Sequence, residues 1–155
     1  MGKPILVVSA CLCGIAVRYD GSCRTVEQLR TLWRRGEALA VCPECMGGLP
    51  VPRQPAERIG DGRVSSCTGA DCTAAFENGA RQVLALCRQY GIKAAVLKEG
   101  SPSCGTREIY DGSFSGFRIP GEGVTTALLR KNGITVFSEE SWLKEKTEAG
   151  EAFGV

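Results

Sequence analysis

Three short apolar segments, each followed by a cysteine, constrain the fold of this chain more than any other feature. Residues 4–9 are almost entirely apolar and rich in β-branched side chains, and residues 38–41 and 94–97 are also apolar. Segments of this kind are typical of strands buried on both faces of a parallel sheet. The cysteines that follow the three predicted strands are Cys11, Cys42 and Cys104.

Helical patterns alternate with these strands. Apolar side chains recur at helical spacing in residues 25–36 and 73–91, and each segment ends at a glycine. A helix over residues 123–130, a strand over 134–137 and a helix capped by Ser138 are expected to follow. This alternation predicts an α/β fold with a mostly parallel central sheet and helices on both faces, the three-layer Rossmann or flavodoxin-like arrangement. The three cysteines would then meet at the carboxyl edge of the sheet, where ligands bind.

The size and composition of the chain fit a single domain, which we place over residues 1–155. A chain of 155 residues with 43% hydrophobic residues can bury one core. Its formal net charge of +2 does not indicate nucleic-acid binding, and no apolar run is long enough to cross a membrane. We therefore expect a cytoplasmic protein. The sequence leaves the oligomeric state open.

Several features of the connecting segments are also predicted. Thr25 and the glutamine three residues later have the spacing of a capping box, and Thr73 is placed to cap the following helix. Four of the seven prolines fall in residues 42–55, which favours a stiff extended loop without a helix or strand. A small hairpin is expected over residues 56–66, and a glycine-rich loop over 110–116.

The chain has nine cysteines and no histidine. A reducing compartment does not favour a disulfide framework, and an odd number of cysteines would leave one unpaired. Without histidine there is no Ser-His-Asp triad, no Cys-His pair and no zinc site with imidazole ligands. Metal or cluster ligation, or catalysis by a thiol, is therefore the leading explanation for the cysteines.

Three thiolates from separate loops are compatible with more than one kind of site. A closed structural zinc site prefers four ligands in two close pairs, and only Cys42 and Cys45 have the C-x-x-C spacing. An iron–sulfur cluster also takes thiolate ligands, and three of them would leave one iron open to a substrate. From spacing alone, a cluster, zinc and redox-active thiols all remain open.

Short motifs with a recognisable order cover nearly the whole chain. They are Ser9-Ala10-Cys11-Leu12-Cys13-Gly14, Arg18-Tyr19-Asp20-Gly21, Cys42-Pro43-Glu44, Gly47-Gly48-Leu49, Pro52-Arg53, Pro55-Ala56-Glu57, Leu97-Lys98-Glu99-Gly100-Ser101-Pro102-Ser103-Cys104-Gly105 and Tyr110-Asp111-Gly112. Together they resemble a family of small bacterial proteins typified by thiouracil desulfidase. The resemblance implies an enzyme that removes sulfur from thiolated pyrimidines such as 2-thiouracil, giving the oxo base and sulfide.

The same resemblance implies a cofactor. It places a [4Fe-4S] cluster on Cys11, Cys42 and Cys104, with one iron not ligated by protein. These are the three cysteines that follow the predicted strands. The chain departs from the family pattern in its additional cysteines, of which Cys13 and Cys45 are close enough in sequence to compete as ligands.

Polar residues of the same motifs are assigned roles in this chemistry. The thiocarbonyl sulfur would bind the open iron, and Glu44 would activate a water molecule that adds to the carbon. Ser101 would donate a hydrogen bond or carry a proton to the ring. Each residue has a structural alternative, because Glu44 could pair with Arg53 and Ser101 could stabilise the turn before Pro102. Weaker candidates for substrate binding are Ser103, Asp20, Arg53 and Lys98.

Two other functions stand beside this one. Desulfuration of a thiolated base in transfer RNA would require RNA binding, which the near-neutral charge does not favour. A non-catalytic zinc or thiol-binding module would require a closed site, which leaves no position for a substrate. Strong, salt-sensitive RNA binding would favour the first alternative, and zinc in place of iron would favour the second.

Overall fold

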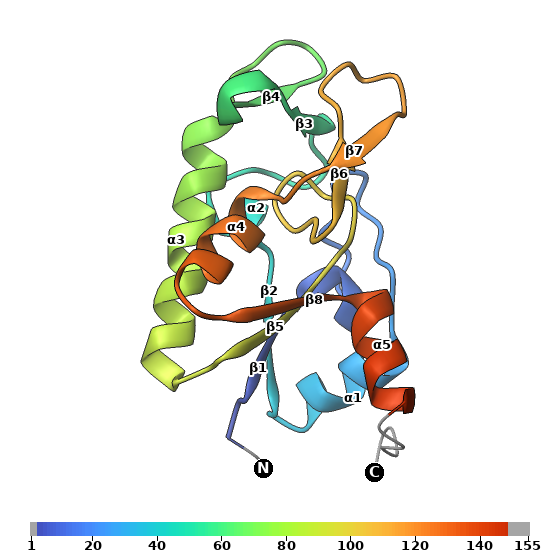
Figure 1. Ribbon diagram of the computed structural model, residues 1–155, viewed down its shortest axis with the longest axis vertical. Coiled ribbons are helices and arrows are strands. Elements are labelled where there is room, and N and C mark those ends of the chain that lie inside the picture. The colour runs from blue at the N-terminus through green and yellow to red at the C-terminus, as the bar shows by residue number, and fades with distance from the viewer. Residues whose placement is uncertain (1–2, 149–155) are drawn as a thin grey trace.

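The computed structural model describes residues 3–148 and has a four-stranded parallel sheet at its centre (Figure 1). The strands, in spatial order, are β2 (Ala38–Val41), β1 (Leu6–Ser9), β5 (Ala94–Leu97) and β8 (Thr135–Ser138). The central residue Val7 lies opposite Leu39 on one side and Ala95 on the other. The three strands predicted to precede the cysteines are therefore present and adjacent.

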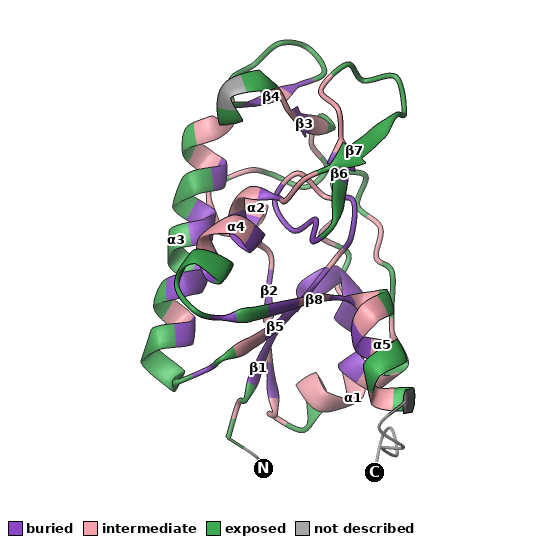
Figure 2. Ribbon diagram, in the orientation of Figure 1, coloured by how far each residue is buried: buried purple, intermediate pink, exposed green. Residues whose placement is uncertain are grey.

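Helices cover both faces of the sheet. They are α1 (Glu27–Arg34), α3 (Thr73–Tyr90), α4 (Val124–Lys131) and α5 (Glu139–Glu148). Leu6 and Val8 belong to a core shared with α1 and α5, whereas Val7 belongs to a second core shared with α3 and α4. Figure 2 shows the buried residues along the strands and on the sheet-facing sides of the helices. The predicted three-layer α/β fold is confirmed.

The course of the chain creates the crevice in which a ligand would be expected. From β1 the chain passes through α1 to β2, and from β2 through α3 to β5 on the opposite side of β1. Such a reversal of strand order leaves an opening at the carboxyl ends of the strands. A short 3₁₀-helix, η1 (Ala10–Cys13), follows β1 directly, and Gly14 ends it at a φ of 91°, a conformation that favours glycine.

Two hairpins stand over this edge of the sheet. One pairs β3 (Ala56–Arg58) with β4 (Val64–Ser66) around the 3₁₀-turn η2 (Gly60–Gly62), as predicted. The other pairs β6 (Glu108–Tyr110) with β7 (Arg118–Pro120), and its strands were not predicted from the glycine-rich loop between them. Figure 1 shows both hairpins in the upper half of the molecule, beyond the carboxyl ends of the strands.

Three local predictions were wrong. The segment 42–55 contains the short helix α2 (Pro43–Met46), because Pro43 occupies the first helical turn, where a missing N–H costs nothing. Thr25 does not cap α1, which starts after Val26 without a side-chain cap. Thr73 is itself the first residue of α3, and its backbone N–H donates to Asp71 Oδ1 at 3.0 Å.

The last helix begins as predicted. Ser138 Oγ accepts a hydrogen bond from the backbone N–H of Ser141 at 3.0 Å, which is an N-cap contact. No helix within residues 3–148 combines the length and apolar character needed to span a membrane.

Candidate functional site

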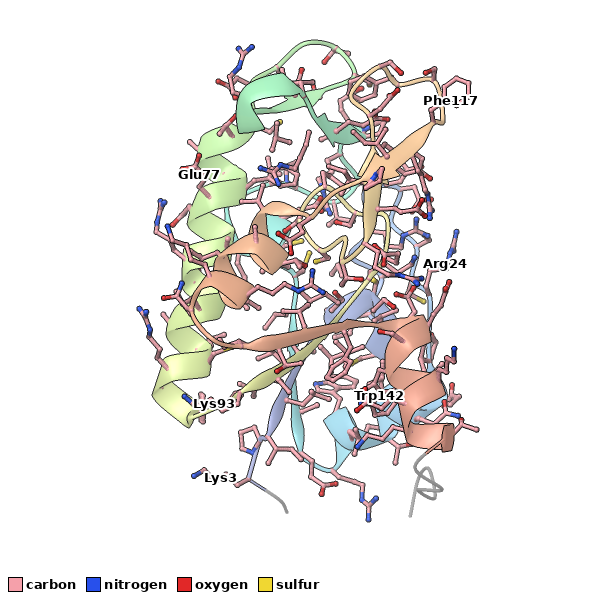
Figure 3. All side chains as sticks on the ribbon, in the orientation of Figure 1. Lys3, Arg24, Glu77, Lys93, Phe117 and Trp142 are labelled. Carbon is pink, nitrogen blue, oxygen red and sulfur yellow. The ribbon has the colours of Figure 1, made fainter. Side chains whose placement is uncertain are left out.

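A cavity of about 310 Å³ opens at the carboxyl edge of the sheet. Cys11, Cys42 and Cys104 all line it, each from the segment that follows a different strand. Figure 3 shows several sulfur atoms in this central region, between the sheet and the hairpins. The structure therefore brings together the three thiols that the sequence placed at strand ends.

Contacts with α4 hold the backbone that carries Cys104. The N–H of Thr125 donates to the carbonyl oxygen of Ser103 at 2.8 Å, and the hydroxyl of Thr126 donates to that of Cys104 at 2.9 Å. Gly123 allows this approach, since a Cβ on it would lie 2.3 Å from the carbonyl carbon of Ser103. The backbone N–H groups in the first turn of α4, which have no partner within the helix, thus donate hydrogen bonds to carbonyl oxygens of the loop that carries Cys104.

A buried carboxylate organises the rest of that loop. Glu99 Oε1 accepts the backbone N–H groups of Gly100 and Thr106 at 3.1 and 2.7 Å, and Oε2 accepts the Thr106 hydroxyl at 2.5 Å. Burial acts to raise the pKa of Glu99, but these hydrogen bonds outweigh it and lower the pKa. Glu99 therefore supports the loop as an ionised hydrogen-bond acceptor.

A close helix crossing positions Cys42 and its neighbours. Gly47, after α2, and Gly79, within α3, have no side chain to keep the two segments apart. A Cβ on Gly79 would lie 1.8 Å from the carbonyl oxygen of Pro43, and one on Gly47 would lie 2.0 Å from that of Ala75. These distances leave no room for a side chain on either glycine, so the two glycines set the position of α2 against α3. Cys42 directly precedes α2, and its position is set in the same way.

The two additional cysteines nearest the site do not line the cavity. Cys13 is only 2% exposed and belongs to the core between the sheet and α1. Cys45 lies on α2, where its sulfur is 3.9 Å from Arg53 Nη1. Cys13 and Cys45 thus lie outside the cavity lining, although the Cys45 thiol still interacts with that of Cys42.

Burial controls the protonation of the three cavity thiols. It raises the pKa of Cys42 and Cys104 to about 12 and that of Cys11 to about 11. A hydrogen bond from Ser9 Oγ to Cys104 Sγ, at 3.5 Å, opposes this effect, as does the charge of Arg18 at Cys11. The thiols therefore hold their protons at neutral pH until a positively charged centre displaces them.

Ser9 is a site residue that the sequence analysis missed. Its hydroxyl donates to Cys104 and accepts the backbone N–H of Lys98 at 3.0 Å, so it joins the ends of β1 and β5. It is 3% exposed. The sequence feature that could have indicated Ser9 is its position, since it is a polar residue at the end of an otherwise apolar strand, two positions before Cys11.

Glu44, Arg53 and Ser101 form the polar side of the cavity. Arg53 contacts Glu44 Oε2 through Nη2 at 2.7 Å and Nε at 2.8 Å. Ser101 Oγ accepts the backbone N–H groups of Ser103 and Cys104, each at 3.1 Å. Its own proton is therefore left to donate to Glu44 Oε1, 3.5 Å away. The ion pair named as the structural alternative for Glu44 is present, and it leaves one carboxylate oxygen facing Ser101.

The weaker candidates for substrate binding divide into two groups. Arg53 and Lys98 line the cavity, and Lys98 Nζ pairs with Glu139 Oε2 at 3.0 Å. Ser103 and Asp20 do not line it. Ser103 Oγ lies 2.8 Å from Thr125 Oγ1 in the protein interior, and Asp20 accepts hydrogen bonds from Ser22 on the surface.

Comparison with known proteins identifies the family. The sequence pattern of the 2-thiouracil desulfurase family matches residues 6–141. The chain belongs to this desulfurase family. The uncharacterised protein YbbK of Bacillus subtilis (strain 168) is 42% identical to this desulfurase-family chain over 144 residues, covering 87% of the chain and 95% of YbbK.

A solved structure extends this likeness to the fold. It is that of TudS, described as a [4Fe-4S]-dependent thiouracil desulfidase, which is 50% identical to this family member. The match covers 96% of this chain and 99% of the other, with a TM-score of 0.87. Both the predicted family and the predicted fold class are therefore confirmed.

The donor set of the cavity in this desulfurase-family chain fits an iron–sulfur cluster. Its donors are three thiols, which are the soft ligands that iron–sulfur clusters prefer. Among residues 3–148, no group of three Cys, Asp or Glu side chains is close enough together to hold a single metal ion.

Proposed function

We propose that this chain hydrolyses the carbon–sulfur bond of thiolated pyrimidines such as 2-thiouracil, giving the oxo base and sulfide. The observation that carries the proposal is that three thiols from three strand ends, two of them buried and that of Cys42 half-buried, line one cavity beside the Glu44 carboxylate. Membership of the 2-thiouracil desulfurase family and the likeness to TudS support it.

Cys11, Cys42 and Cys104 would hold a [4Fe-4S] cluster, with one iron not ligated by protein. When bound, that iron supplies a Lewis acid for the thiocarbonyl sulfur of the substrate. The depth of the thiols, of which Cys11 and Cys104 are 7% and 5% exposed, limits the access of bulk water to them.

Glu44 is the proposed general base. Arg53 binds one oxygen of its carboxylate and orients the group, while the other oxygen remains available to a water molecule. The water gives its proton to Glu44 as its oxygen adds to the carbon that bears sulfur. Ser101 donates to the same carboxylate oxygen and can pass a proton between Glu44 and the substrate.

Substrate contacts are proposed for the residues that line the cavity. Lys98 and Arg53 provide positive charge near the polar atoms of a pyrimidine, although both already have partners. Ser103 and Asp20, which lie away from the cavity, are proposed to act on the conformation of their loops.

We further propose a cytoplasmic enzyme with one catalytic domain over residues 1–155, of which residues 1–2 and 149–155 lie outside the described part. A small thiolated pyrimidine, free or as a nucleoside, suits a cavity of about 310 Å³. The net charge of +2 supports a small substrate over transfer RNA.

Anaerobic reconstitution with iron and sulfide tests the proposal. The loaded protein should contain close to four iron atoms per chain and convert 2-thiouracil to uracil and sulfide, both measured after chromatography. Protein that binds zinc tightly, takes up no iron and leaves 2-thiouracil intact would support the zinc module instead.

Cysteine variants test the ligand set. Cys11→Ala, Cys42→Ala and Cys104→Ala should each lose the cluster, as measured by iron content and visible absorption. The matched control is Cys87→Ala. Cys87 is a buried cysteine of α3 that packs in the hydrophobic core and does not line the cavity. Loss of the cluster in Cys13→Ala or Cys45→Ala, with one of the three proposed ligands dispensable, would show that the ligand set is wrong.

A further inference from the structure

Arg18 lines the cavity but has no part in the reaction described above. Three cationic side chains line this cavity, and two of them have partners: Arg53 pairs with Glu44, and Lys98 pairs with Glu139. The third is different. Arg18 Nη1 is a buried nitrogen that has no hydrogen-bond partner within residues 3–148.

The position of Arg18 is fixed by its backbone and not by its guanidinium. Its N–H donates to the carbonyl oxygen of Ser22 at 3.1 Å, and its carbonyl oxygen accepts the N–H of Gly21 at 2.7 Å. The next carbonyl, that of Tyr19, accepts the N–H of Arg53 at 2.7 Å. The turn is therefore complete without the side chain, which is free to serve a ligand.

An unpartnered guanidinium N–H in a buried position is unfavourable. A buried donor without an acceptor costs about 1–3 kcal/mol, and more for a charged group. Buried polar groups in native proteins nearly always have partners, and an exception calls for a water molecule, an ion or a ligand. No carboxylate in residues 3–148 forms an ion pair with Arg18, although, after the hydrogen bonds from Ser22, its charge helps to lower the pKa of the exposed Asp20 carboxylate. The guanidinium thus brings to the cavity a positive charge without a direct anionic partner in the described part of the chain.

We propose that Arg18 donates a hydrogen bond from Nη1 to an anionic sulfur atom in the cavity and so acts as a positioning residue for the site. This inference rests on the proposed function, because that function gives anionic sulfur two sources. One is the cluster with its thiolates, and the other is the hydrosulfide released from the substrate. Guanidinium groups form strong charge-assisted hydrogen bonds with anions.

Charge and proximity support this assignment. Three thiolates bring more negative charge than an oxidised [4Fe-4S] core brings positive charge, so a neighbouring cation stabilises the assembly. Arg18 is near the thiols, since it lines the same cavity as Cys11, Cys42 and Cys104. The carbonyl oxygen of the preceding residue, Val17, lies 3.9 Å from Cys42 Sγ. The same positive charge attracts a hydrosulfide ion.

Variants of Arg18 in the cluster-loaded protein test the inference. Arg18→Gln removes the charge and the guanidinium, while Arg18→Lys keeps the charge without the planar set of donors. The matched control is Arg24→Gln, because Arg24 is an exposed arginine of the same loop that does not line the cavity (Figure 3). Iron content and circular dichroism confirm that each variant is folded and loaded.

Two measurements distinguish the sources of sulfur. If Arg18 donates to the cluster, the reduction potential of Arg18→Gln without added sulfide becomes more negative than that of the wild type and Arg24→Gln, with Arg18→Lys between them. If Arg18 donates to hydrosulfide, that potential is unchanged and the affinity for added sulfide falls by about tenfold or more.

Each outcome bears on a different claim. Arg18 variants that keep the wild-type potential and the wild-type sulfide affinity, while fully loaded, would overturn the inference and leave the proposed function intact. A wild-type protein that takes up no cluster would overturn the proposed function, and the inference with it. If Arg18→Gln does not fold, Arg18→Lys must still shift one of the two quantities.

Discussion

Glu44 and Arg53 show how a charged pair can orient a reactive group. Their side chains are 15% and 8% exposed, so the attraction between them is weakly screened by water. Two nitrogens of the guanidinium converge on one carboxylate oxygen, which a lysine could not do with the same geometry. The other oxygen points toward Ser101 and the cavity. The pair therefore holds the Glu44 carboxylate in a fixed orientation, as its proposed role as general base requires.

Replacement of Glu44 by glutamine is expected to lower the rate of desulfuration by about 10²–10⁴-fold, because the amide cannot accept a proton from water. The cluster content should stay close to that of the wild type, since Glu44 is not a proposed ligand. Activity is measured as uracil released per loaded cluster. Glu27→Gln, which changes an exposed carboxylate on α1, is the control, and a Glu44→Gln activity equal to it would show that Glu44 is not the base.

Sequence was sufficient to find the thiols but not the side chains that surround them. Cys11, Cys42 and Cys104 could be predicted to meet because the carboxyl ends of adjacent parallel strands share one edge. The direction of a loop side chain is not set by such a rule. Ser103 faces Thr125, a residue of the distant helix α4, and Arg18 lines the cavity, and neither direction follows from the strand pattern.

The crossing of α2 and α3 connects a helix contact to the site. The short helix α2 follows Cys42 directly and carries Glu44, so any displacement of α2 moves both a proposed ligand and the proposed base. Its distance from α3 is set by Gly47 and Gly79, each of which leaves room for a backbone carbonyl of the other segment. The two glycines are thus part of the architecture of the site, although neither lines the cavity.

Substitution of Gly79 by alanine should therefore affect both stability and the cluster. The added methyl group would have to push α2 away, at a cost of about 1–3 kcal/mol in the free energy of unfolding. Helix propensity alone would predict the opposite sign, because alanine favours a helix by about 1 kcal/mol.

Urea unfolding and iron content after reconstitution measure the two effects. Gly60→Ala is the control, since a Cβ there would meet no atom within 4 Å. A Gly79→Ala protein more stable than the wild type, with a full cluster, would contradict this account of the crossing.

The elements that sequence predicted correctly are those with strong periodic patterns. The strands β1, β2 and β5 are apolar runs between turn residues, and α3 has a long amphipathic pattern ending at Gly91. The helix α2 and the strands β6 and β7 are too short to show a period. The strand β7 is also fully exposed and ends in a proline, so it has neither the burial nor the composition of a typical strand.

At the scale of the molecule, residues 3–148 form two cores, one on each face of the sheet, and the site lies where both reach the carboxyl edge. Cys11 belongs to the core with α1 and α5, whereas Cys104 belongs to the core with α3 and α4. A cluster bound by both would link the two halves of the hydrophobic interior. The site is thus a product of the entire fold, and the stability of the fold depends on the state of the thiols.

The protein without its cluster is expected to lose stability as the pH rises above 9. The ordinary pKa of 9.0 is raised in the folded protein to about 11 for Cys11 and about 12 for Cys42 and Cys104. Between these values the unfolded chain has lost thiol protons that the folded chain keeps, so the free energy of unfolding decreases with pH. Below pH 9 both states keep these protons, so the three thiols make their full contribution to the free energy of unfolding.

Urea midpoints at about pH 8 and about pH 10 measure this dependence. Cys104→Ala should show a shallower fall than the wild type, because one raised pKa has been removed. Equal slopes in the two proteins would mean that Cys104 titrates in the folded state as it does in the unfolded chain.

The placement of the three thiols on strands far apart in the chain also has a consequence for biosynthesis. Cys11 and Cys42 precede Cys104 in the chain, and the segments that form α3 and β5 are translated between Cys42 and Cys104. On the proposed ligand set, a nascent chain cannot complete the site before β5 has emerged and paired with β1. Delivery of iron and sulfide must therefore come late, to a domain whose sheet is already largely assembled.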